Sequence, residues 1–244
     1  MKMPLLRQII SCLVYTSMMA ALIGCNDESP SSRSASALID SIAQSQEAFR
    51  LGHHFMKIGD DEKALEAYSR AIELEPDFAE AYAFRGQLHV IMGHFRDGIF
   101  DLDKMIALDP SASSYRLRAD VKATNGYYEE AIRDYNKLLE LDPNSAAVYN
   151  NRGTAYGENK GYKNAISDIT HAIQLAPNEP DYYLNRGKFK MLLGDYDSAM
   201  IDVTNCIRLS GGNPDLRPGE SREVNKTNFN CMRLLTKLKK AKAP

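Results

Sequence analysis

A repeat of about 34 residues organises most of this 244-residue chain and limits what it can fold into. Each repeat has two stretches with apolar residues at helical spacing, and a short turn separates them. One such helix pair cannot bury its apolar face alone, so neighbouring pairs must stack, and about three or more are needed. The sequence therefore predicts an all-α chain, an α-solenoid of about five helix-turn-helix repeats at residues 45–78, 79–111, 112–145, 146–179 and 180–212.

Small residues mark the same two places in every repeat. Two antiparallel helices approach closely only where side chains are small, and the marker positions hold Gly52, Gly86, Ala119, Gly153 and Gly187 in the first helix and Ala64, Gly98, Ala131, Ala165 and Ala199 in the second. A glycine, which tolerates positive φ, occupies the turn at Gly59, Gly93, Gly126 and Gly194, whereas Gly161 is shifted by one position in the fourth repeat. These markers resemble the tetratricopeptide repeat (TPR) family over residues 45–212.

The resemblance implies that the first helices of successive repeats line a concave groove that binds a protein or peptide. Two groove positions, Asn151 and Asn185, are equivalent, and each is followed by Arg-Gly. An asparagine amide can both donate to and accept from the backbone of an extended peptide. The alternative is that Asn-Arg-Gly is a common repeat variant without a ligand role. The candidate peptide-binding residues are Phe49, Phe84, Gln87, Arg116, Asn150, Asn151, Asn185 and Lys188.

The first 24 residues are typical of a signal peptide. Lys2 and Arg7 precede a mostly apolar, uncharged run over residues 9–24, and the sequence then turns polar. The stretch Leu22-Ile23-Gly24-Cys25 resembles the lipobox of bacterial lipoproteins, which implies a lipid on Cys25 and attachment to a membrane of the cell envelope, facing the periplasm. Because Asn26 and not aspartate follows the cysteine, the outer membrane is preferred. A single transmembrane anchor or an ordinary signal peptide is the alternative.

The segments on either side of the repeats have separate expected roles. Residues 25–44 are expected to be the lipidated cysteine and a flexible tether, with a short helix over 36–44. Residues 213–244 are expected to be a linker and a capping helix whose apolar face holds Val224, Cys231, Leu235 and Leu238. Outside the cytoplasm Cys206 and Cys231 could form a disulfide that joins cap and repeats, with two buried free thiols as the alternative.

No catalytic motif appears in the sequence. It has no GxSxG, GxxxxGK, HExxH or CxxC, so we expect no enzyme activity and no cofactor. His53 and His54 point about 100° apart on one helix, His89 is assigned to core packing and His94 to a turn, so no metal site is expected either. A net charge of −2 gives no basic field for nucleic acid.

These observations favour a membrane-anchored scaffold or adaptor for protein–protein interaction. The groove changes from aromatic and apolar in the first two repeats to polar and basic in the last two, so the expected ligand has an apolar end and an acidic or carboxylate end. Two alternatives stay open. One is a structural envelope protein that forms homo-oligomers, and the other is a pilotin or assembly factor for a secretion or pilus system.

Overall fold

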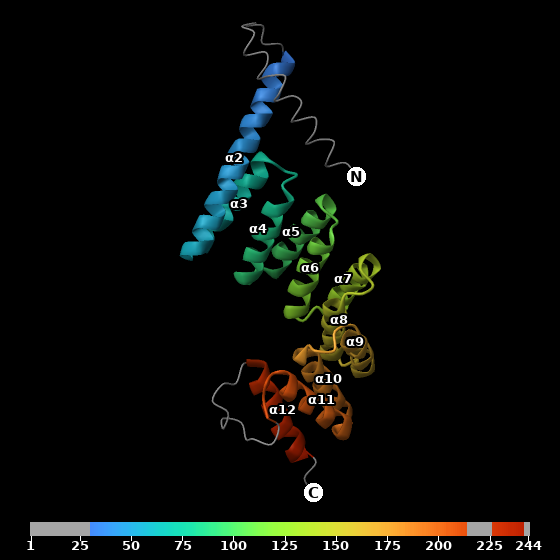
Figure 1. The fold of residues 1–244 in the computed structure, drawn as a ribbon. Helices are drawn as coiled ribbons and strands as arrows, with labels where there is room; N and C mark the ends of the chain where they lie inside the picture. The colour runs from blue at the N-terminus through green and yellow to red at the C-terminus, as the bar shows by residue number, and fades with distance from the viewer. Residues whose placement is uncertain (1–29, 214–225, 242–244) are drawn as a thin grey trace. The chain divides into compact units, whose positions relative to one another are not determined.

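Helices make up all the regular structure in residues 30–213 and 226–241, the part of the chain that the computed structural model describes (Figure 1). The predicted all-α class is confirmed, because these residues form eleven α-helices and no strand. The helices are α2 (Pro30–Ile58), α3 (Asp61–Leu74), α4 (Ala79–Ile91), α5 (Phe95–Leu108), α6 (Ala112–Thr124), α7 (Tyr128–Leu141), α8 (Ala146–Glu158), α9 (Tyr162–Leu175), α10 (Pro180–Leu193), α11 (Tyr196–Leu209) and α12 (Lys226–Ala241).

Consecutive helices form pairs, and the pairs stack within two compact units. Unit 1 extends to Leu108 and contains α2 paired with α3 and α4 paired with α5, with α3 packed on α4. Unit 2 begins at Asp109 and contains the pairs α6–α7, α8–α9 and α10–α11, followed by α12. In unit 2, α7 packs on α8, α9 on α10, and α11 on α12. Each unit thus buries the faces that a single pair would leave exposed.

The second helix of each pair supplies most of the apolar core. In α7, the residues at helical spacing are all buried, namely Ala131, Ile132, Tyr135, Leu138 and Leu139. Each square ångström of apolar surface removed from water stabilises the fold by about 25 cal/mol, so this stripe holds α7 against both of its neighbours.

Glycines set the distance between paired helices where the sequence places them. A Cβ atom on Gly86 of α4 would lie 2.9 Å from the carbonyl oxygen of Gly98 in α5. A Cβ atom on Gly98 would lie 2.6 Å from the carbonyl oxygen of Gly86. Real Cβ atoms do not approach backbone oxygens so closely, so α4 and α5 cross at a distance that only this glycine pair permits.

The turn between paired helices uses a left-handed residue in every repeat. Four are glycines, with φ of 76° at Gly59, 85° at Gly93, 85° at Gly126 and 90° at Gly194. In the fourth repeat the left-handed residue is Lys160, with φ of 65°, and Gly161 has φ of −80°. Gly161 therefore does not supply the left-handed residue of this turn. Lys160 supplies it instead, in a conformation that costs an L-residue about 1–2 kcal/mol.

An arginine–aspartate pair that is largely shielded from water recurs in four repeats, and it was not predicted from the sequence. The arginine stands just before the small residue of the first helix and donates two hydrogen bonds to an aspartate in the second helix, 16 residues later. Such bidentate pairs are among the strongest hydrogen-bonded contacts in proteins. The pairs are Arg85–Asp101 in unit 1 and Arg118–Asp134, Arg152–Asp168 and Arg186–Asp202 in unit 2.

Three of these arginines also contact the preceding helix pair of the same unit. Arg186 donates to Thr170 Oγ1 in α9 at 3.1 Å, and Arg152 donates to Asn136 Oδ1 in α7 at 2.7 Å. In unit 1, Arg85 donates to Ser69 Oγ in α3 at 3.2 Å. One guanidinium group therefore connects three helices, so these charges belong to the interior and not to a solvated surface.

The helix α12 closes the last repeat. Cys231, Leu235 and Leu238 are buried against α11, together with Met232 and Leu234, whereas Val224 lies outside the described residues. The structure joins Cys231 to Cys206 of α11 in a disulfide, with 6.2 Å between their Cα atoms.

The tether expected over residues 25–44 requires a correction. Residues 30–44 belong to α2, which continues without a break to Ile58. The Ser41 hydroxyl of α2 donates to the Leu74 carbonyl oxygen at 2.8 Å, and the Ser45 hydroxyl bonds to the Glu75 carboxylate. Polar contacts to the end of α3 thus hold α2 beyond the limit of the repeat. Within the described residues, no helix combines the length and the apolar character that crossing a bilayer requires.

Candidate functional site: a polar groove in unit 2

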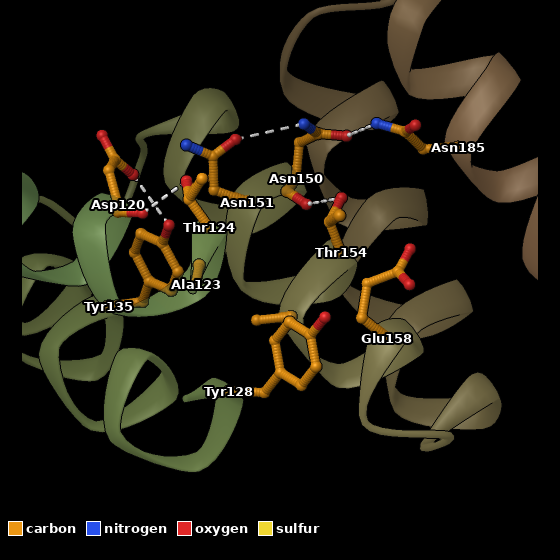
Figure 2. A pocket seen from close by; sticks show the side chains of 11 residues that line it. Asp120, Ala123, Thr124, Tyr128, Tyr135, Asn150, Asn151, Thr154, Glu158 and Asn185 are labelled. Carbon is orange, nitrogen blue, oxygen red and sulfur yellow. Dashed lines mark hydrogen bonds between the residues drawn. The ribbon is translucent and has the colours of Figure 1, made fainter. Parts of the chain in front are cut away.

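A cavity of about 410 Å³ opens among α6, α7, α8 and α10 of unit 2 (Figure 2). Nine of its eleven lining residues carry a polar group on the side chain, and we call it the asparagine cavity. The residues that line it are Asp120, Ala123, Thr124, Tyr128, Tyr135, Asn150, Asn151, Thr154, Ala155, Glu158 and Asn185. Three of the predicted groove residues therefore meet here, although they come from two different repeats.

Three amide side chains form a directional row at this cavity, which Figure 2 shows as a line of dashed contacts. Asn185 Nδ2 donates to Asn150 Oδ1 at 3.0 Å. Asn150 Nδ2 in turn donates to Asn151 Oδ1 at 3.3 Å. Because each amide orients the next, the row is held in place before any ligand arrives.

The row retains hydrogen-bonding capacity that it does not use internally. An asparagine amide offers two N–H groups and one carbonyl oxygen with two lone pairs. Neither Asn151 Nδ2 nor Asn185 Oδ1 has a hydrogen-bond partner within the described part of the chain. The row therefore presents a donor at its Asn151 end and an acceptor at its Asn185 end. Such a pair matches the N–H and C=O groups of an extended peptide backbone.

The other rim of the cavity carries a fixed carboxylate. The Tyr135 hydroxyl donates to Asp120 Oδ1 at 2.7 Å. Burial raises the pKa of the Tyr135 phenol, and the hydrogen bond to Asp120 raises it further. Tyr135 is therefore a permanent donor at neutral pH, and Asp120 keeps its other oxygen, Oδ2, for a second donor.

The neighbouring residues of each first helix explain why the amides face the cavity. Asn185 is followed by Arg186, whose side chain donates to Asp202 of α11. Gly187 comes next, where α10 and α11 approach closely. A Cβ atom on Gly187 would lie 3.0 Å from Val203 Cγ2. Successive helical residues point about 100° apart, so with arginine and glycine turned inward the asparagine faces out.

A second cavity of about 370 Å³ lies between α10 and α12 and shares Asn185 with the first. We call it the basic cavity, and the two together form the unit 2 groove. It combines the three cations Lys188, Arg233 and Lys237 with Asn185 and Asn230 and with the apolar residues Leu184, Met191, Leu192 and Leu234. Lys188 also pairs with Glu158 of α8, which lines the asparagine cavity. Lys188, a basic residue of the predicted groove, therefore lies in a cavity to which α12 contributes two further cations.

The remaining predicted groove residues lie elsewhere. In unit 1, the rings of Phe49 and Phe84 are 5.6 Å apart, and each contacts the His53 ring at 4.5 and 4.4 Å, respectively. Gln87 donates to the Ala83 carbonyl oxygen of its own helix. In unit 2, Arg116 is exposed and lines neither of the two cavities. The lipidation candidate Cys25 lies outside the described residues.

Among the groove residues that the sequence did not predict, two have a clear reason for having been missed. Tyr135 lies on the apolar face of α7, where its ring is buried, but its hydroxyl reaches the cavity. Asn230 comes from the capping helix and carries no repeat signature, since only the docking of α12 on α10 brings it to the groove.

Comparisons with protein families match the repeats directly. A family model described as a TPR repeat matches residues 52–93 and 119–160. A second, described as a tetratricopeptide repeat, matches residues 146–179 and 180–213. Together these matches cover more than half of the chain.

Similar curated proteins share only a short segment. An SGT1 homolog of Oryza sativa subsp. japonica is 46% identical over 52 residues, which are 21% of this chain and 14% of the relative. The UDP-N-acetylglucosamine–peptide N-acetylglucosaminyltransferase of Giardia intestinalis is 40% identical over 62 residues, which are 25% of this chain and 4% of that enzyme. The chain therefore spans only a small part of the length of these relatives.

Solved structures resemble the chain over a longer stretch. MamA from residue 41 to its end, of Desulfovibrio magneticus RS-1, has a TM-score of 0.62 at 19% identity and covers 68% of this chain and 94% of that one. YrrB, described as a TPR protein with an unusual peptide-binding site, has a TM-score of 0.57 at 16% identity and covers 71% and 92%. PilF of Pseudomonas aeruginosa has a TM-score of 0.56 at 19% identity and covers 72% and 80%. At these identities the likeness concerns the fold, and it confirms the predicted helical-repeat solenoid.

Proposed function

The chain belongs to the tetratricopeptide repeat family, and we propose that it is a scaffold that binds an extended peptide segment of a partner protein in the unit 2 groove. The observation that carries this proposal is the row formed by Asn185, Asn150 and Asn151, which keeps an open donor and an open acceptor. Backbone hydrogen bonds of this kind are independent of the peptide side chains. They supply affinity, and the adjoining cavities supply specificity.

The basic cavity defines the preferred end of the peptide. Lys188, Arg233 and Lys237 favour a carboxylate, either a C-terminus or an acidic side chain. Leu184 and Leu192 line the same cavity and favour an apolar side chain beside that carboxylate. We therefore infer a ligand whose acidic, partly apolar end lies at α12 and whose backbone continues along the amide row.

Selection of peptides on the full chain tests this proposal. Random peptides are selected by display, synthesised, and titrated calorimetrically against wild-type chain and groove variants. Each lost hydrogen bond is worth about 0.5–1.5 kcal/mol, so Asn151→Ala and Asn185→Ala are each expected to weaken binding by up to about tenfold. The matched control is Asn144→Ala, because Asn144 is an exposed turn residue outside the groove and its substitution is expected to leave affinity unchanged.

The charge preference has its own control. Arg233→Ala with Lys237→Ala is expected to weaken acid-ended peptides and leave amidated, neutral peptides unaffected, and added salt is expected to reduce the difference. Lys239→Ala on the same helix, outside the cavity, is the matched control. Equal affinities for the wild-type chain and for the asparagine and arginine–lysine variants would refute the assignment of the groove.

We further propose that a lipid on Cys25 holds the scaffold on a membrane of a bacterial cell envelope, with the repeats facing the periplasm. The support is the sequence pattern of residues 1–25. Palmitate labelling and membrane fractionation of cells that express the chain provide the test. Cys25→Ala is expected to abolish the label and release the chain, whereas Cys12→Ala, a matched change within the same apolar segment, is expected to do neither. A Cys25→Ala chain that still fractionates with membranes would contradict the lipid anchor.

A further inference from the structure

Two histidines meet at the turn between α4 and α5 in unit 1. The His94 backbone N–H donates to the His89 carbonyl oxygen at 2.7 Å, and the Gly93 N–H donates to the Val90 carbonyl oxygen at 3.0 Å. With Gly93 at φ of 85°, these two bonds make a Schellman motif, which brings together the side chains of the residues that precede and follow the turn. Here both are imidazoles, and their ring centroids are 5.9 Å apart.

The same backbone motif in the other repeats provides an internal comparison. Each has the equivalent long hydrogen bond across the turn, but none places two histidines there. The equivalent pairs are Phe55 and Asp60, Lys122 and Tyr127, Tyr156 and Gly161, and Lys190 and Asp195. The fold therefore does not require imidazoles at these positions, and the histidine pair is specific to the second repeat.

His89 leaves one ring nitrogen without a partner. In the third and fifth repeats the equivalent lysines, Lys122 and Lys190, reach the buried aspartates Asp134 and Asp202 at 3.1 and 2.8 Å. His89 takes the same place but is shorter, and its Nε2 stays 3.9 Å from Asp101 Oδ2. Its Nδ1 is buried and has no hydrogen-bond partner among the described residues. A buried polar atom in that state calls for an explanation, because most such atoms are paired.

A carboxylate completes the cluster. Asp97 stands one helical turn after His94, in the first turn of α5. Single ligand atoms of His89, His94 and Asp97 all lie within 4.8 Å of one another. A tetrahedral ion with ligands at about 2.0–2.2 Å brings them to roughly 3.3 Å. His94 and Asp97 are exposed, so their side chains can rotate by that amount without disturbing the core.

We propose that His89, His94 and Asp97 form a binding site for a divalent transition-metal ion of the Zn²⁺ type. Two imidazole nitrogens and one carboxylate oxygen are donors that suit zinc, and water would fill the remaining position. His89 would use Nδ1, because its Nε2 faces Asp101 Oδ2 at 3.9 Å, the side on which many metal-bound histidines have a carboxylate. The ion would brace the end of α4 to the start of α5. This inference departs from the sequence-based expectation that the chain binds no metal.

Titration of the full chain with Zn²⁺ tests the site. The chain is prepared without a polyhistidine tag, in detergent where needed, and binding is measured by competition with a chromophoric chelator. We expect one equivalent of Zn²⁺ that His89→Gln and His94→Gln each remove and that Asp97→Asn weakens at least tenfold. The matched control is His54→Gln, because His54 is an exposed histidine of unit 1 outside the cluster and its substitution is expected to leave that equivalent in place.

A second measurement separates metal binding from folding. Zn²⁺ is expected to raise the melting temperature of the wild-type chain and of the His54→Gln variant, because an ion that binds only the native state stabilises it. It is expected to leave the His94→Gln variant unchanged, and far-UV circular dichroism of that variant without metal is expected to match the wild type. Zn²⁺ binding that is equal in all variants, or no binding above the chelator background, would overturn the proposal.

Discussion

Replacing Asp202 by alanine is expected to destabilise the last repeat by about 3–5 kcal/mol. The Asp202 side chain is 1% exposed and accepts hydrogen bonds from Arg186 Nε at 2.8 Å and Nη2 at 2.6 Å. Lys190 Nζ lies 2.8 Å from its Oδ2. The substitution therefore leaves two cations, 15% and 17% exposed, without their counter-charge. Uncompensated buried charge, and not the lost attraction alone, sets the size of the effect.

The same reasoning gives an opposite expectation when the whole cluster is made apolar. A triple variant, Arg186→Met, Lys190→Met and Asp202→Leu, buries no charge and keeps most of the side-chain volume. Replacement of a buried ion cluster by apolar residues is often neutral or stabilising. The matched surface control is Glu140→Ala in the Lys137–Glu140 pair, whose side chains are 55% and 62% exposed. That change is expected to leave the stability nearly unchanged, because solvent screens an exposed pair.

Hydrogen exchange followed by mass spectrometry measures these differences locally. This matters because a stack of repeats need not unfold in one step. A loss of 3–5 kcal/mol corresponds to exchange in α10 and α11 that is on the order of 10²–10⁴ times faster. The triple variant is expected to restore most of the protection. If Asp202→Ala changes exchange less than fivefold, or if the triple variant is as unprotected as the single one, the argument from buried charge is wrong.

Three further predictions concern a helix contact, the turns and the disulfide. Gly157→Ala is expected to lower the free energy of unfolding in urea by about 1–3 kcal/mol, because its Cβ would lie 2.2 Å from the Phe189 ring. Adding Phe189→Leu is expected to recover part of that loss. Lys160→Gly is expected to stabilise the fold by about 1 kcal/mol, and Gly126→Ala is expected to destabilise it by a similar amount, because both positions have positive φ. Melting temperatures of both variants equal to that of the wild type would count against this. Replacing both Cys206 and Cys231 by alanine is expected to cost about 3 kcal/mol, because their bond closes a loop with a sequence separation of 25, and faster exchange confined to α12 is the expected sign.

The period of the sequence predicts the helices but not every turn residue. Small residues such as Gly86 and Gly98 could be recognised because the contact they make allows no larger side chain. Lys160 could not, since the alignment of glycines pointed to Gly161. The two hydrogen bonds of the turn, from Lys160 N–H to Gly157 and from Gly161 N–H to Tyr156, are the same as in the other repeats, so position 160 must be left-handed although it holds a lysine.

The repeat period could not predict two other features, because they depend on contacts outside the repeat pattern. The helix α2 continues N-terminal of the first repeat, where the Ser41 hydroxyl bonds to the Leu74 carbonyl oxygen, and a pattern that begins at residue 45 does not include Ser41. The Cys206–Cys231 pairing depends on the register of α12 against α11, and residue spacing alone does not determine it. The arginine–aspartate pairs could have been predicted, because the same separation of 16 residues recurs from Arg85 onward. They were not, because charged residues are mostly exposed in proteins.

The Asn-Arg-Gly triplets link the proposed peptide site of unit 2 to the contacts that stabilise its helices. In α10, Gly187 lets α11 approach and Arg186 spans the helices to Asp202, so Asn185 is left facing the groove on a backbone that its two neighbours fix. An amide on a fixed backbone loses little freedom on binding, which is how a site of a few hydrogen bonds gains affinity. Asp202→Ala is therefore expected to weaken peptide binding although Asp202 lies outside both cavities. Asp202 would act as a positioning residue, and the triple apolar variant, which restores the packing, is expected to restore the affinity as well.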